Sequence, residues 1–169
     1  CFLEENGIAR VCEAHFCSKF RYSAIRTGNR RKELSDMANK KVEIMIDDVR
    51  IVAELFMDEA PEICNMILNN PGQRAVIQHA KLNGQLFFGT LPYSCGFENK
   101  CRGGDLVLGD LAYYNPRNQL CFLYGKGTDE PLPISKIGRI VEGLEGMKVV
   151  GIKNWLNQGS MMTIVGEVE

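Results

Sequence analysis

Cysteine and histidine have the widest reactive chemistry of the residue types present, and their spacing supports little of it. The chain has seven cysteines and two histidines. Five residues separate Cys95 from Cys101, and no C-x-x-C motif occurs, so a zinc site would need an unusual set of ligands. Glycine-rich phosphate-binding motifs are absent too. We therefore expect no metal and no cofactor. A nucleophilic pair formed by Cys121 and His79 remains as an alternative.

Two carboxylates, Asp105 and Asp110, lie close together in the sequence and could form an acid–base pair. Glycines surround them at positions 103, 104 and 109. Aspartate is common in turns because its side chain bonds to nearby backbone groups. The sequence therefore favours a turn role for both.

The composition of the chain excludes several classes of protein. Of its 169 residues, 45% are hydrophobic and 24% are charged, which is ordinary for one globular domain. Its net charge is −1, whereas a nucleic-acid-binding protein typically carries a basic surface. The longest apolar runs, such as Leu120–Tyr124, are far shorter than the roughly 20 residues that span a membrane. We expect neither a nucleic-acid nor a membrane partner, and a homo-oligomer stays open.

Residues 1–36 differ from the rest, because their apolar residues follow neither a helical nor a strand period for long. They contain no continuous apolar run of the kind found in signal peptides, so we expect reduced cysteines and a cytoplasmic location. Lys32-Glu33 can be encoded by AAG-GAG, which resembles a bacterial ribosome-binding site ahead of the first methionine, Met37. We hypothesise that translation starts at Met37. Residues 1–36 would then be an upstream leader or a cloning remnant, disordered or loosely packed, before a domain over 37–169. The alternative is a native extension that packs on the domain as a helix.

Short alternating segments dominate the sequence after residue 40, and a period of two indicates strands with one buried face. Strands are expected over residues 41–46, 49–56, 74–82, 85–88, 109–114, 119–124, 137–141 and 161–168, with loops over 89–104 and 125–133. Asp47-Asp48 and Asn83-Gly84 are hairpin-turn signals. One helix is expected to start at Pro61, because proline is tolerated in a first turn, and a short one over 143–149. Many short strands with two brief helices predict an all-β protein, a closed barrel.

Several segments, in order, carry a resemblance to a known family. Val52–Asn65 contains the pattern E-L-F-x-D-x-x-P, and Ile137–Met147 reads I-G-R-I-V-E-G-L-E-G-M. The first is similar to the cyclophilin segment between the second strand and the first helix, and the other to the family's F-G-K-V-V-E-G-M segment. Gly109–Pro116 and Leu120–Gly125 are similar to small prokaryotic cyclophilin-like proteins of unassigned function. Over residues 41–169 the resemblance implies a closed eight-stranded barrel capped by two helices.

The same resemblance implies a prolyl-isomerase site whose key residue is missing. Cyclophilins speed rotation about X–Pro bonds, which has a barrier of ~18–20 kcal/mol, with an arginine in an F-H-R-I-I-P segment. The matching segment Phe87–Pro92 has Gly89 at the arginine position. A second family segment, C-Q-G-G-D, matches Cys101–Asp105 with Arg102 in place of glutamine. Arg102 could therefore supply a guanidinium from another place.

A groove on the side of the barrel is the expected ligand site. Its expected residues are Phe88, Arg102, Tyr113, Asn115 and Phe122, and Tyr114 could also alternate into it. Ordinary barrel packing is the alternative for the aromatic residues, a turn role for Asn115 and a solvated loop position for Arg102. We predict a binding module that takes a small molecule or a short peptide without efficient prolyl isomerisation. The alternative is an enzyme, either a weak prolyl isomerase that uses Arg102 or Arg117, or an unassigned activity in the same groove.

Overall fold

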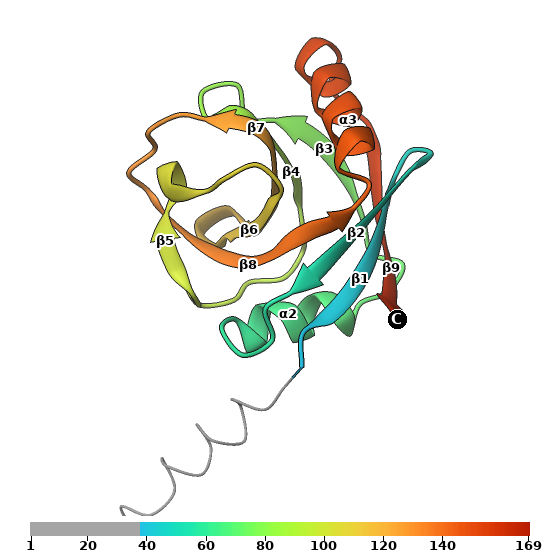
Figure 1. The fold of residues 1–169 in the computed structure, drawn as a ribbon, viewed down its shortest axis with the longest axis vertical. Coiled ribbons are helices and arrows are strands. Elements are labelled where there is room, and N and C mark those ends of the chain that lie inside the picture. The colour runs from blue at the N-terminus through green and yellow to red at the C-terminus, as the bar shows by residue number, and fades with distance from the viewer. Residues whose placement is uncertain (1–37) are drawn as a thin grey trace, which may run out of the picture.

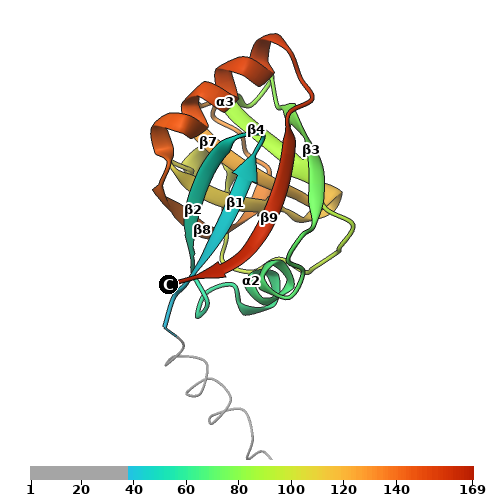
Figure 2. The ribbon, with the colours of Figure 1, turned by 90° about the vertical axis from the view of Figure 1, so that its right-hand side faces the viewer.

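Eight antiparallel strands form a closed ring in the computed structural model, which describes residues 38–169 (Figures 1 and 2). The order around the ring is β2-β1-β9-β3-β4-β7-β6-β8, and pairing of β2 with β8 closes it. These strands are β1 (Lys40–Ile46), β2 (Val49–Leu55), β3 (Arg74–His79), β4 (Gly84–Thr90), β6 (Asp110–Tyr114), β7 (Gln119–Gly127), β8 (Pro133–Glu142) and β9 (Met161–Val168). A further strand, β5 (Lys100–Arg102), pairs with β8. The predicted closed β-barrel is confirmed, whereas the hypothesis about residues 1–36 lies outside the described residues.

Alternation along the strands places one set of side chains inside the ring. On β3, Ala75, Ile77 and His79 are buried and the residues between them are exposed, which is the period of two expected of a strand with one buried face. The rings of Phe87 on β4 and Phe122 on β7 stack in the core with their centroids 5.0 Å apart. Full burial of a side chain of this size contributes about 1.5–3 kcal/mol. Packing in the core thus fixes β4 and β7 relative to each other, and the two strands position the side chains on their outer face.

The predicted turn between β1 and β2 is confirmed at Asp47 and Asp48. Asp47 has a φ of 53°, a left-handed conformation that aspartate tolerates better than most residues. Its carboxylate pairs with the ammonium of Lys153 at 2.7 Å and accepts a bond from the N–H of Met161 at 2.9 Å. These two bonds lower the pKa of Asp47 to about 2, and the bond with Lys153 makes the larger contribution.

The two helices lie at opposite ends of the barrel (Figure 2). Helix α2 (Pro61–Leu68) begins at the predicted proline. The carboxylate of Glu98 accepts bonds from the N–H groups of Glu62 and Ile63 at 3.1 and 2.8 Å. It thereby satisfies free donors of the first turn and meets the positive end of the helix dipole. No helix within residues 38–169 is long and apolar enough to cross a membrane.

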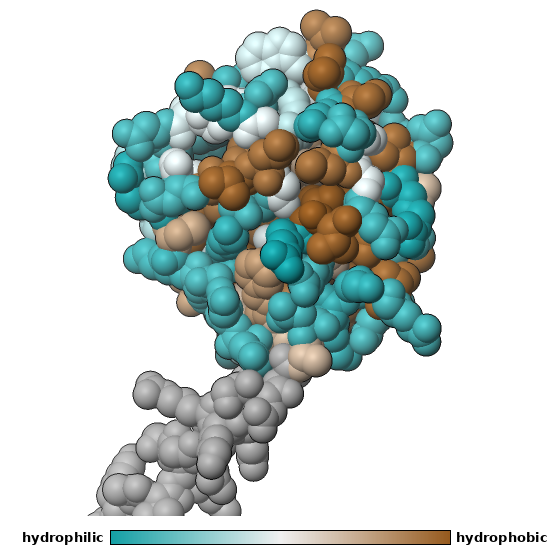
Figure 3. Space-filling view, in the orientation of Figure 1, coloured by the Kyte–Doolittle hydropathy of each residue, from teal (hydrophilic) through white to brown (hydrophobic). Residues whose placement is uncertain are grey.

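Helix α3 (Leu144–Leu156) is longer than the predicted helix over 143–149. Its inner face lies on the ring of Tyr124, and a Cβ at Gly151 would lie 2.5 Å from that ring. Glycine therefore permits this close approach. The exposed apolar residues on its outer face are Val149, Ile152 and Leu156, and brown surface covers much of the α3 region in Figure 3. Because apolar residues occur on both faces, the sequence lacks a clear helical period beyond the first turns.

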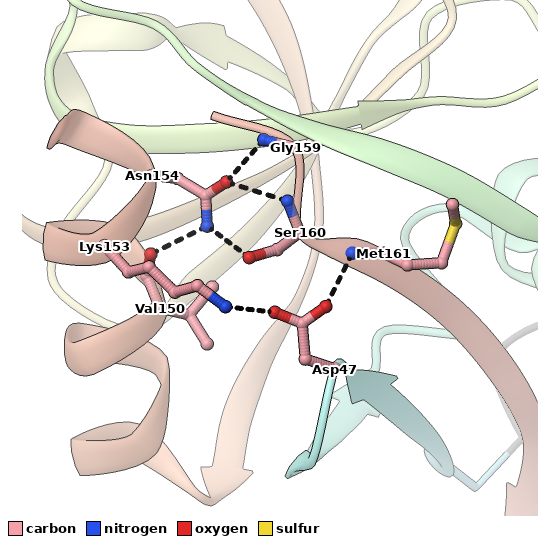
Figure 4. Close-up of polar contacts among 7 residues, drawn as sticks. All are labelled: Asp47, Val150, Lys153, Asn154, Gly159, Ser160 and Met161. Atoms are coloured by element: carbon pink, nitrogen blue, oxygen red, sulfur yellow. Dashed lines mark hydrogen bonds and ion pairs between the residues drawn. The ribbon is translucent and has the colours of Figure 1, made fainter. Parts of the chain in front are cut away.

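A network around Asn154 fastens the last turns of α3 to the start of β9 (Figure 4). This side chain is fully buried. Its amide nitrogen donates to the carbonyl of Val150 at 2.9 Å and to the hydroxyl of Ser160 at 3.0 Å. Its oxygen accepts bonds from the N–H groups of Gly159 and Ser160, each at 3.2 Å. All hydrogen-bonding groups of the amide are therefore satisfied within the chain.

The segments expected to be loops contain more regular structure than the sequence indicated. The predicted loop over 89–104 includes β5 and runs into a 3-10 helix, η1 (Gly103–Asp105). Strands β7 and β8 extend into the predicted loop over 125–133 and leave only 128–132 between them. Both changes follow from backbone pairing that brings distant segments together, which a local pattern does not show.

The Asn83-Gly84 turn also differs from the prediction of a two-residue hairpin. The N–H of Ala80 donates to the carbonyl of Leu86 at 2.9 Å, so a longer loop connects β3 to β4. Gly84 instead pairs with Gly127 on β7. The connection between β3 and β4 is longer than two residues because Gly84 pairs with β7 and does not close a tight turn between β3 and β4.

Candidate functional site

A cavity of about 410 Å³ lies on the outer face of β4, β7, β6 and β8, and we call it the outer-face cavity. Its volume is within the range typical of small-molecule sites. The floor comes from β4 and β7, where Leu86 pairs with Leu123 and Phe88 with Cys121. The residues between these point the opposite way, into the barrel core. The site is thus built directly on the strands that the core holds in place.

Apolar residues on both faces of β7 explain why a second cluster exists outside the barrel. Residues 120–124 of this strand are all buried, which is typical of a strand that is covered on both sides. The core covers the inner side, and β5, η1 and the loop 128–132 cover the outer side. The buried residues of the outer cluster are Leu86, Leu106, Ala112, Cys121, Leu123 and Ile134.

Two loops meet to form the roof of the outer-face cavity. The Arg102 guanidinium pairs with Asp129 at 2.7 Å, and the N–H of Gly104 donates to the carbonyl of Glu130 at 2.8 Å. A Cβ at Gly104 would lie 3.0 Å from the Asp129 carboxylate and from the backbone nitrogen of Glu130, so glycine allows the loops to approach closely. The Asn83 amide donates to the Glu130 carboxylate at 2.8 Å and ties the β3–β4 loop to the same roof.

One end of the cavity carries three polar side chains. Tyr114 on β6 and Gln119 on β7 face each other across the hairpin. Arg117 lies between them in the 3-10 helix η2 (Asn115–Arg117). All three line the cavity, and none of their side-chain polar atoms has a hydrogen-bond or ion-pair partner within residues 38–169. These groups are available to a bound molecule.

The polar side chains at the other end are used within the chain. The ammonium of Lys81 lies 5.4 Å from the centroid of the Trp155 ring, a favourable cation–π arrangement. The Glu130 carboxylate accepts a bond from the backbone N–H of Leu132 at 3.1 Å, besides its bond from Asn83. The two ends of the cavity therefore differ in the hydrogen-bonding capacity that they leave free.

The thiols beside the cavity are poor nucleophiles. Burial raises the pKa of Cys121 to about 12, and burial also raises the pKa of Cys101, whereas a thiol must lose its proton to attack. His79 lies on the inner side of the sheet, with its Nε2 2.7 Å from the Tyr124 hydroxyl. The sheet separates it from Cys121, so the pair considered from sequence does not form.

The carboxylates Asp105 and Asp110 do not act as a pair in the cavity either, since neither lines it. Asp110 accepts a bond from the N–H of Val107 at 2.8 Å and pairs with Lys136 at 2.9 Å, so it holds a turn, as the sequence indicated. Within residues 38–169, no three side chains of His, Cys, Asp and Glu converge on a possible metal site.

Of the residues that the sequence indicated for the groove, Phe88 lines the outer-face cavity. Tyr113 and Phe122 are fully buried in the barrel core, and their chain neighbours Tyr114 and Cys121 line the cavity instead. A shift of one residue along a strand exchanges its two faces, which accounts for the difference. The unbroken apolar run over residues 120–124 is the signal that could have revealed an outer cluster.

Arg102 and Asn115, the other two indicated residues, lie outside the cavity lining. Arg102 holds the roof through Asp129. Asn115 is buried; its amide donates to the carbonyl of Cys95 at 3.1 Å, and its oxygen accepts a bond from the hydroxyl of Ser135 at 2.8 Å. Both residues therefore fix chain segments next to the cavity and are not part of its lining.

Gly89, at the position expected for a catalytic arginine, faces the core. A Cβ there would lie 2.8 Å from the Met162 Cε and 3.1 Å from the Ala75 Cβ. A side chain at this position would point away from the outer-face cavity. Any guanidinium in the cavity must come from elsewhere, and Arg117 is the arginine that lines it.

Comparison with known proteins supports the fold. A sequence model described as the cyclophilin-like family matches residues 60–155. The structure of McbB in complex with tryptophan is similar at a TM-score of 0.67 and 17% identity, over 76% of this chain and 45% of that one. The solution structure of the hypothetical protein AF2241 from Archaeoglobus fulgidus is similar at a TM-score of 0.57 and 20% identity, over 75% of this chain and 93% of that one. This chain thus spans less than half of the McbB chain, and no curated protein matches it.

Proposed function

This chain belongs to the cyclophilin-like family, and we propose that it binds a small, largely apolar molecule in the outer-face cavity. The observation that carries the proposal is the cavity of about 410 Å³ between an apolar floor and a roof whose two loops are joined by hydrogen bonds and an ion pair. Protein interiors are normally close-packed. An apolar space with a few polar groups at its ends is what a small-molecule site requires.

The McbB structure supports this capacity, because it has the same fold and contains tryptophan. Its similarity concerns the fold alone, since functions are grafted onto folds independently. A chain that contains a barrel of this type over 45% of its length can therefore bind a small molecule.

The roof favours a small molecule over a short peptide. Contacts of Arg102 with Asp129 and of Gly104 with Glu130 hold residues 103–105 against 128–130 over the floor. An extended peptide is usually recognised at an exposed sheet edge or in an open groove. A peptide here would have to break the roof.

A weak prolyl isomerase is the second candidate, because the Arg117 guanidinium lines an apolar cavity. Such catalysis needs a donor that stabilises the twisted amide more than the planar one. No hydrogen bond or ion pair within residues 38–169 orients Arg117. Losing a positioned donor lowers a rate by ~10²–10³, so we expect little or no turnover in a protease-coupled assay on an X–Pro peptide. Turnover like that of an ordinary cyclophilin would contradict a pure binding role. Arg102→Ala and Arg117→Ala, measured separately, would then identify the arginine responsible.

Binding itself is tested with indole, an uncharged apolar probe, titrated into the full chain and followed by NMR chemical shifts. Ala80 lines the cavity, so Ala80→Phe places a ring in it, and we expect the indole Kd to rise at least ~10-fold. Val76→Phe is the control, because Val76 is 50% exposed on β3 and is not a lining residue. Equal binding by Ala80→Phe and the wild type would place the indole elsewhere and contradict the proposal.

A further inference from the structure

We propose that the ligand of the outer-face cavity is an apolar monocarboxylic acid, with its carboxylate on Arg117 and its apolar body along the floor of β4 and β7. This inference rests on the proposed function of the same cavity. It adds the chemical class of the ligand and the direction in which the ligand lies.

The free polar groups at the Arg117 end are the first argument. Tyr114, Arg117 and Gln119 offer a hydroxyl, a guanidinium and an amide, all lining the cavity and all without a partner within residues 38–169. Arg50, Arg102 and Arg139, in contrast, each pair with a carboxylate of the chain at 2.7 Å. The Arg117 end is therefore built from donors whose acceptor is not supplied by the described chain.

The charge of the lining is the second argument. Its cations are Arg117 and Lys81, and its one acid is Glu130. Both oxygens of Glu130 already accept bonds in the roof, from Asn83 and from the N–H of Leu132. No carboxylate therefore lines the cavity at the Arg117 end. A planar guanidinium matches a carboxylate with two parallel hydrogen bonds, and such charge-assisted bonds are among the strongest that proteins form.

The direction of the ligand follows from the strands. β4 runs from the Lys81 end to the Arg117 end over six residue steps, or roughly 20 Å at the usual rise of a strand. The side chains along this path are Leu86, Phe88, Cys121 and Leu123. Lys81 competes poorly as the anion site, because its ammonium lies over Trp155 and Glu130 compensates charge at that end. The apolar body therefore extends from Arg117 toward Lys81.

Three indole probes separate the carboxylate from the apolar body. Indole-3-propionate has the carboxylate, tryptamine has an ammonium instead, and indole has neither. We expect the wild-type full chain to bind indole-3-propionate roughly 10–100-fold more tightly than tryptamine, as a charged hydrogen bond predicts. Arg117→Gln should remove most of this preference, and the Kd of indole in the same variant serves as the reference for any change in the apolar part of the cavity. Arg74→Gln is the matched control, because Arg74 is also exposed and without an ion pair within residues 38–169 but lies outside the lining.

The outcomes distinguish this inference from the proposed function. If indole binds in the cavity but the acid gains nothing over tryptamine, the cavity binds ligands and the carboxylate assignment is wrong. Equal losses in Arg117→Gln and Arg74→Gln would mean that net charge, not a site at Arg117, sets the preference, and would also overturn it. If neither indole nor the acid shows saturable binding, the proposed function fails and the inference fails with it.

Discussion

The polar residues that join α3 to the barrel and those at the Arg117 end of the outer-face cavity are alike in type and opposite in bonding. Around Asn154 and Asp47, amide, carboxylate and ammonium groups bond to one another and to backbone groups (Figure 4). Around Arg117, an amide, a phenol and a guanidinium have no such bonds within residues 38–169. Polar groups that satisfy one another hold a fold together. Polar groups left free at the end of an apolar cavity are suited to hold a ligand.

The sharpest test of this contrast is a pair of substitutions to leucine. Asn154→Leu leaves the N–H groups of Gly159 and Ser160 without their acceptor in a buried site, at about 1–3 kcal/mol for each. We expect the free energy of unfolding to fall by about 3 kcal/mol. Arg117→Leu should change it by less than about 0.5 kcal/mol, as for most exposed positions. Urea denaturation measures both, and similar losses in the two variants would erase the distinction.

The polar groups near α3 can be tested in another way, through the pH dependence of the free energy of unfolding that His79 causes. Burial, together with the nearby Lys81, lowers the pKa of His79 below 6.5, and its Nδ1 has no hydrogen-bond partner within residues 38–169. The unfolded chain therefore binds this proton more readily than the folded one. The contribution to stability is complete above about pH 6.5 and decreases as the pH falls from there toward the lower folded pKa. Denaturation at pH 7.5 and 5 should show this loss in the wild type. His79→Leu should show less of it, and an equal loss in both would assign it to other groups.

Asp47 should show a smaller effect in the same direction, at lower pH. Its pKa of about 2 lies below the unfolded value of 3.8, so its contribution is present above pH 3.8 and is lost as the pH falls toward about 2. The Lys153 pair is partly exposed and screened by solvent, so Asp47→Asn should cost less than about 1 kcal/mol at neutral pH. Denaturation of the wild type and the variant at pH 6 and 2.5 measures this. A gap between them that stayed constant with pH would contradict the assignment.

The smallest effect is expected from removing residues 1–36. The barrel core and the outer cluster described above both lie within residues 38–169. A chain that begins at Met37 should therefore stay folded and melt within a few degrees of the full chain. A loss above ~2 kcal/mol, about one large buried side chain, would show that the segment packs on the barrel.

Local patterns in the sequence were enough to predict the barrel. The β1–β2 turn at Asp47 and the start of α2 at Pro61 depend on neighbouring residues, and both are confirmed. The length of α3 and the presence of β5 depend on partners far away in the chain. Neither Gly151, which fits against Tyr124, nor β5, which pairs with β8, carries a local signal of that contact.

The candidate site was predicted less fully, for a related reason. Strand periodicity predicts that Phe88 and Tyr114 each lie on the opposite face of the strand from their chain neighbours. It does not say which of the two faces is the outer one. Where both faces are apolar, as on β7, the inward Phe122 and the outward Cys121 look alike from the sequence. Arg117 lines the cavity and has no hydrogen-bond or ion-pair partner among residues 38–169, and neither property can be read from the sequence.

The central claim is that the outer face of β4 and β7 binds a small apolar molecule, and its most direct test is a map of shift changes. Indole-3-propionate is titrated into the isotopically labelled full chain, and amide shifts are followed in NMR spectra. We predict saturable changes along Leu86, Phe88, Cys121 and Leu123 and at Arg117, with little change around Asn154. Changes confined to the α3 end, or none that saturate, would contradict the account.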